Sequence, residues 1–159
     1  MKWLNPNFGI ALLVAMAPGC SRRVDTQADA QAIRDMETEW NQDFMARNVE
    51  RLVSHYAEGA VLMAPGMPPA AGKAGIRKVL RAMVADPALT VKFRAARIDV
   101  AASGDLGYAW GSYLMTMTDP QTKRIVHDHG SYVTTYRRES DGAWKAVADI
   151  ATSEVGPPG

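Results

Sequence analysis

The chain has 159 residues, with 18 Lys and Arg against 17 Asp and Glu, so it is long enough for one domain with a buried core and is close to neutral. Near-neutral charge gives no electrostatic reason to bind nucleic acid or an anionic membrane surface. The single cysteine, Cys20, excludes an internal disulfide.

The first residues have the layout of a secretory signal, with a basic residue followed by the apolar run Phe8–Ala17, which is too short to span a bilayer. The segment Ala17–Cys20 is similar to a bacterial lipobox, although alanine stands where leucine is usual. We expect a lipoprotein signal peptide at residues 1–19, lipidation of Cys20, and a periplasmic location in the bacterial envelope. Signal peptidase cleavage before Pro18, giving a soluble secreted protein, and an uncleaved apolar start are the alternatives.

A single domain is expected over residues 28–152, preceded by a polar tether at 20–27 and followed by a disordered tail at 153–159. There is no internal repeat and no sign of a second domain.

Apolar residues at helical spacing predict three helices in the first half of the domain. The first covers about 28–47, where Thr26 and Asp29 form a weak capping box. The second runs from Val49 to about Tyr56 and the third covers about 73–85. A short strand, 60–63, lies between the last two.

The second half is rich in Tyr, Trp, Thr and Val, which favour strands. Strands are predicted at 91–100, 106–118, 130–137 and 143–150. In the first of these the alternation slips by one residue, which indicates a β-bulge near Ala96 and Arg97. Helices followed by strands predict an α+β fold, with three helices packed on one side of a curved antiparallel sheet.

The strand 106–118 carries large apolar residues on both faces. Leu106, Tyr108 and Trp110 share one face, whereas Tyr113 and Met115 share the other. Because the helices can cover only one face, we expect the other to meet a second copy of the chain in a homodimer.

Asp149 breaks the apolar pattern of the last strand, and a carboxylate buried there needs a partner or a polar pocket. One interpretation is a pocket carboxylate with a raised pKa that acts as a base or anchors a ligand. The other is a structural carboxylate that accepts hydrogen bonds from Trp40 or from a helix end.

His127 and His129 share one face of their strand, so both could approach one metal ion or act as an acid–base pair at a pocket mouth. With two ligands only and no HExxH motif, we expect no metal; a solvated strand end is the alternative. His55 is expected at a rim or in a capping role.

Aromatic and thioether side chains suit a flat, mostly apolar small molecule, and ordinary core packing is the alternative for each of them. The candidate pocket residues are Trp40, Tyr56, Met63, Met83, Trp110, Met115, Met117 and Tyr132. No phosphate loop, nucleophile elbow or cofactor motif is present in the sequence, so we expect no cofactor.

An ordered set of landmarks spans Ile33 to Ile150: the helix with Trp40, the segments 52–56, 60–66 and 105–111, and the 141–145 turn followed by Asp149. In this set the chain resembles the SnoaL-like, ketosteroid-isomerase-like branch of the nuclear transport factor 2-like superfamily. The resemblance implies a cone-shaped, cystatin-like fold with a pocket at its open end and homodimers through the sheet.

Function does not follow from that resemblance. The catalytic Tyr and Asp of the steroid isomerases match Trp40 and Ala64, neither of which can move a proton in the required way. We therefore expect no steroid isomerase activity. The expectations that remain are non-catalytic binding of a small apolar or aromatic compound, a SnoaL-like enzyme using Asp149 with His127 or His129 for proton transfer, and a dimerising module that holds a partner protein.

Overall fold

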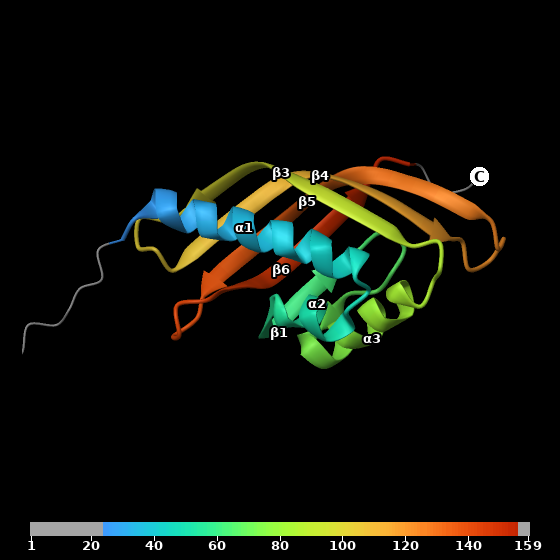
Figure 1. The fold of residues 1–159 in the computed structure, drawn as a ribbon, viewed down its shortest axis with the longest axis horizontal. Coiled ribbons are helices and arrows are strands. Elements are labelled where there is room, and N and C mark those ends of the chain that lie inside the picture. The colour runs from blue at the N-terminus through green and yellow to red at the C-terminus, as the bar shows by residue number, and fades with distance from the viewer. Residues whose placement is uncertain (1–23, 156–159) are drawn as a thin grey trace, which may run out of the picture.

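The computed structural model describes residues 24–155, in which helices α1 (Thr26–Met45), α2 (Val49–Ser54) and α3 (Gly72–Val84) pack on a six-stranded sheet (Figure 1). The strands are β1 (Tyr56–Met63), β2 (Ala70–Ala71), β3 (Thr90–Val100), β4 (Leu106–Thr118), β5 (Ile125–Arg138) and β6 (Trp144–Ser153). Their order is β2-β1-β6-β5-β4-β3. The predicted α+β class, with helices on one side of a curved sheet, is confirmed; the signal peptide and the tail beyond residue 155 lie outside the described residues.

One pair of strands departs from the expected antiparallel sheet. β1 runs parallel to β6, and every other pairing is antiparallel. A parallel pair needs a long crossover rather than a hairpin, and here nearly the whole domain lies between the two strands. The sheet is therefore mixed, and β6 lies between β1 and β5 at its centre.

Helix ends follow from local chemistry, with two differences from the sequence prediction. Asp25, rather than Thr26, caps α1: its Oδ1 accepts from the backbone N–H groups of Gln27 and Ala28 at 3.1 and 3.0 Å. Asn48 caps α2 in the same way. The second helix ends at Ser54, so Tyr56 begins β1 instead of ending a helix.

The core lies between α1, α2, α3 and the concave face of the sheet, and its fully buried members include Ile33, Leu52, Tyr56, Ile76 and Tyr136. The bulge in β3 is present as predicted, because the register with β4 shifts between Ala95 and Arg97. A bulge bends the strand that carries it, and α1 packs along the same strand (Figure 1).

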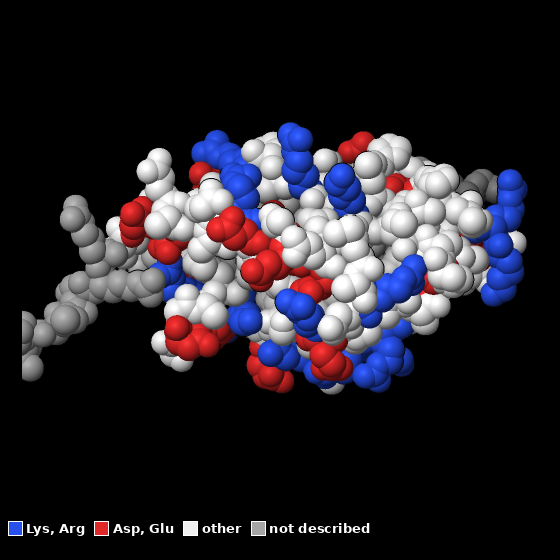
Figure 2. Space-filling view, in the orientation of Figure 1, with Lys and Arg blue, Asp and Glu red and all other residues white. Residues whose placement is uncertain are grey.

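The convex side of the sheet, called the outer face below, carries exposed apolar side chains: Leu106, Tyr108, Trp110, Leu114, Ile125 and Val133. On the helical side both signs of charge are mixed without a patch of one sign (Figure 2). Of the helices in residues 24–155, none combines the length and the apolar content needed to cross a membrane.

Candidate ligand-binding site

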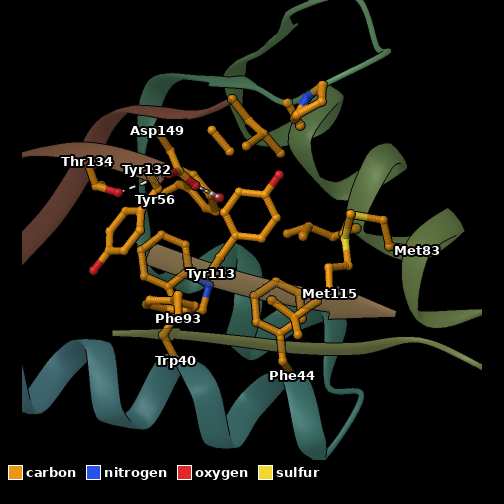
Figure 3. A pocket seen from close by; sticks show the side chains of 16 residues that line it. Trp40, Phe44, Tyr56, Met83, Phe93, Tyr113, Met115, Tyr132, Thr134 and Asp149 are labelled. Carbon is orange, nitrogen blue, oxygen red and sulfur yellow. Dashed lines mark hydrogen bonds between the residues drawn. The ribbon is translucent and has the colours of Figure 1, made fainter. Parts of the chain in front are cut away.

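A cavity of about 110 Å³ lies between the concave face of the sheet, α1 and α3, and it is partly open to solvent. Its walls are almost entirely aromatic and aliphatic carbon (Figure 3). The lining residues are Trp40, Phe44, Tyr56, Leu62, Ala64, Pro65, Leu80, Met83, Val91, Phe93, Tyr113, Met115, Tyr132, Thr134, Asp149 and Ala151. Asp149 is the one charged residue among them.

Asp149 is held on β6 between two hydroxyl donors. Tyr56, at the start of β1, donates to Oδ2 at 2.7 Å, and Thr134, directly opposite on β5, donates to Oδ1 at 2.9 Å (Figure 3). The surrounding protein raises the pKa of Asp149 because burial penalises the charged form, and the two hydrogen bonds offset part of that shift. Neither Trp40 nor a helix end is its partner, so the alternative interpretation named the wrong contacts.

A second carboxyl group lies behind the cavity wall. Glu37 of α1 is buried and accepts from the hydroxyl of Tyr136 at 2.8 Å and from that of Tyr132 at 3.1 and 3.2 Å. Burial raises the pKa of Glu37, and the nearby charge of Asp149 raises it further. Tyr132 therefore connects the two regions, because it donates to Glu37 and also lines the cavity.

Trp40 forms part of the floor of the cavity, and it is supported from behind by a buried pair. Its indole stacks on the imidazole of His55 with ring centroids 4.8 Å apart. His55 Nε2 lies 2.8 Å from Asp43, which also accepts from Arg51 at 3.1 Å. Burial lowers the pKa of His55, against the opposing effect of Asp43. Within residues 24–155 the buried Nε1 of Trp40 has no hydrogen-bond partner.

Most of the predicted pocket residues meet in this cavity. Trp40, Tyr56, Met83, Met115 and Tyr132 all line it, together with Asp149. Met63, Trp110 and Met117 are not among its lining residues. Trp110 points to the outer face, where it is 47% exposed, because its parity on β4 is opposite to that of Tyr113.

His127 and His129 are not brought to the cavity. They lie on exposed positions of β5 and line a separate hollow of about 520 Å³ together with residues of β3 and β4. Nδ1 of His127 is 3.0 Å from the hydroxyl of Thr116. Within residues 24–155 no group of three His, Cys, Asp or Glu side chains is close enough to hold a metal ion.

The sequence prediction missed several important residues. Phe93 and Tyr113 face each other across β3 and β4, and both reach the cavity. Tyr113 lies on the same face of β4 as Met115, which was a predicted pocket residue, so this shared face could have identified Tyr113 as part of the wall. Glu37 could have been found as an acid within the apolar stripe of α1, three residues before Trp40.

Comparison with known proteins identifies the family to which the chain belongs. The family model of the SnoaL-like domain matches residues 37–147, which is more than half of the chain. The chain belongs to the SnoaL-like domain family. No curated protein matches it.

Solved structures support the same fold for this SnoaL-like domain. A ketosteroid isomerase-like protein from Erwinia carotovora atroseptica SCRI1043 is 17% identical, with a TM-score of 0.69 over 80% of this chain and 98% of the other. A nuclear transport factor 2-like protein with a cystatin-like fold from Novosphingobium aromaticivorans is 20% identical, with a TM-score of 0.67 over 82% and 85%. Hexachlorocyclohexane dehydrochlorinase LinA-type3 from Novosphingobium barchaimii LL02 is 18% identical, with a TM-score of 0.69 over 81% and 88%. At these identities the likeness is one of fold.

Proposed function

We propose that this SnoaL-like domain is a binding protein for a small, mostly apolar or aromatic molecule, with Asp149 as its polar anchor. The observation that carries the proposal is the cavity itself: carbon walls surround a single carboxyl group that is fixed by Tyr56 and Thr134. Ligand sites commonly combine apolar walls with a few fixed polar groups in this way.

The size of the cavity limits the ligand. Its volume of about 110 Å³ is somewhat below the roughly 150 Å³ of an engineered apolar cavity that holds benzene. Because the site is partly open, a single ring with a short substituent fits the available space.

A panel of one-ring compounds tests the proposal, with toluene, phenol, benzyl alcohol, acetophenone and benzylamine added separately in isothermal titrations. Ala64→Phe places a ring in the cavity, whereas Ala101→Phe adds the same ring to the exposed turn after β3. We expect at least one compound to bind the parent chain and Ala101→Phe, but not Ala64→Phe. Equal binding to all three chains would contradict the proposal, as would no binding of any compound at millimolar concentration.

A second candidate is an enzyme that transfers a proton, and the raised pKa of Asp149 inside a cavity favours it. One of the similar solved structures is a dehydrochlorinase. The second titratable group within reach of Asp149 is Tyr56, whose pKa burial raises well above its usual value, so Asp149 is the group that would accept a proton. Exchange of the α-protons of acetophenone in D₂O, lost in Asp149→Asn, would support catalysis; no exchange above buffer would exclude it for this ketone.

The same proposal includes self-association through the outer face. Its exposed apolar side chains, with Trp110 47% and Leu114 63% exposed, form the kind of contiguous surface that a second copy covers. Light scattering should give a dimer for the parent chain and a monomer for Trp110→Glu. A parent chain that is monomeric at micromolar concentration would refute this.

Export and lipid anchoring complete the proposal, and they rest on the layout of residues 1–20. Labelled palmitate should be incorporated by the parent chain and not by Cys20→Ala. Label retained on Cys20→Ala would refute anchoring at this residue.

A further inference from the structure

Within the described residues, Asp149 and Glu37 differ from the buried acids Asp43 and Asp29 in making no ion pair. Asp43 is paired with Arg51 and His55, and Asp29 is paired with Arg138. The hydrogen-bond partners of Asp149 and Glu37 are hydroxyl groups, and Arg34 acts on Glu37 only as a charge without forming an ion pair with it. A carboxylate taken out of water without a counter-charge is costly, and a cationic ligand beside Asp149 would supply that counter-charge.

Asp149 still has capacity for another donor. A carboxylate offers about four lone-pair sites. Tyr56 and Thr134 each occupy one site, on different oxygens, and the carboxyl group is turned toward the cavity (Figure 3). An added donor from the cavity can therefore reach it without displacing either hydroxyl.

The walls around that position also favour a positive charge. Trp40, Phe93 and Tyr132 bring aromatic rings to the same cavity, and aromatic faces attract ammonium groups. Glu37 adds a second acid behind Tyr132, and its effect on a cation in the cavity has the same sign as that of Asp149.

We propose that the cavity selects an amine carried on a single aromatic or apolar ring, with the ammonium group donating to Asp149 and lying against the aromatic walls. This inference rests on the proposed binding function and names the class of its ligand. The opposing arrangement is a protonated Asp149 that donates to a carbonyl or hydroxyl oxygen; in that case neutral oxygen-containing rings bind better than the amine.

Three ligands of nearly equal shape test the inference: benzylamine, benzyl alcohol and ethylbenzene, titrated calorimetrically into the full chain in phosphate buffer at neutral pH. We expect benzylamine to bind about tenfold or more tightly than benzyl alcohol. Asp149→Asn should remove that preference, so that its affinities for benzylamine and benzyl alcohol differ by less than about threefold. Asp35→Asn, an exposed change of the same kind on α1, should alter neither affinity.

If Asp149→Asn does not fold, Glu37→Gln provides the test, because it removes the second acid behind Tyr132 without entering the cavity. It should reduce the preference for benzylamine by a smaller factor than tenfold. A parent chain that binds benzyl alcohol or ethylbenzene as tightly as benzylamine overturns the amine inference and leaves the binding function standing. A chain that binds none of the three rings overturns both.

Discussion

The bulge in β3 makes a specific demand on Gly111 of β4. A Cβ added there would clash with the carbonyl oxygen of Arg94 and would lie 2.9 Å from two backbone atoms, Cα of Ala95 and N of Ala96. All three contacts are with backbone inside a paired strand, so no side chain can rotate to make room. Gly111→Ala therefore forces the bulge, and the curvature that it provides, to change.

The expected cost is large for a single methyl group. Overpacking in a well-packed region costs typically about 1–3 kcal/mol, occasionally more. Because the obstructing atoms are backbone, we expect a loss of about 3 kcal/mol in the free energy of unfolding, which lowers the melting temperature of a domain of this size by roughly 10 °C.

Thermal unfolding followed by circular dichroism measures this effect. Gly59→Ala is the matched control, because an added Cβ at Gly59 meets no atom within 4 Å. It should melt within about 2 °C of the parent chain. Should Gly111→Ala melt as close to the parent as the control does, the close approach of β3 and the reasoning from it are wrong.

Three further predictions concern the charged groups of the fold. Arg47 donates to the carbonyl oxygens of Val84, Asp86, Pro87 and Leu89 at 2.7, 2.6, 3.0 and 3.1 Å. Arg47→Ala should cost about 2 kcal/mol in urea unfolding, and Arg47→Lys should restore less than half of it, because an ammonium cannot span four acceptors; full restoration would mean that charge alone matters. Tyr136→Phe removes the 2.8 Å donor to buried Glu37 and should cost about 1–3 kcal/mol by the same assay, whereas an unchanged midpoint would show that Glu37 is not held by this hydrogen bond. The pKa of Asp149 is raised above its ordinary value of 3.8, so its contribution to stability is fully present below that pH and is lost as the pH rises through the folded value. The stability of the parent chain minus that of Asp149→Asn should therefore fall as the pH rises above about 4; a difference that grows with pH would contradict this expectation.

Elements that leave a periodic pattern in the sequence could be predicted. The alternation of side chains predicted the strand 106–118, and a slip in that alternation predicted the bulge near Ala96. The apolar stripe containing Trp40 and the isolated acid Asp149 also identified two sides of the cavity. Tyr56 was placed on a helix, since its spacing from Leu52 and Val53 continues a helical stripe. Only pairing with β6, which is about 90 residues away in sequence, makes it the first residue of a strand.

Contacts between distant elements could not be predicted in the same way. Nothing local in the sequence joins Glu37 to Tyr136, because the two meet only where the sheet packs on α1. Thr134 lies opposite Asp149 across the β5–β6 pair, but the shift in register between Thr135 and Tyr136 hides that pairing from a count outward from the turn. The two-residue strand β2 is too short to produce a pattern. His127 and His129 satisfied the spacing rule for a shared face, but the face is the exposed one.

A one-ring ligand bound as proposed lies in the cavity against Trp40 and Asp149. The most direct measurement follows the indole N–H signals of the ¹⁵N-labelled full chain, assigned by Trp→Phe variants, while benzylamine is added. We expect the signal of Trp40 to move to saturation and the signal of Trp110, on the outer face, to stay in place. A shift of the Trp110 signal with Trp40 unmoved, or no shift of either at millimolar ligand, would contradict this binding mode.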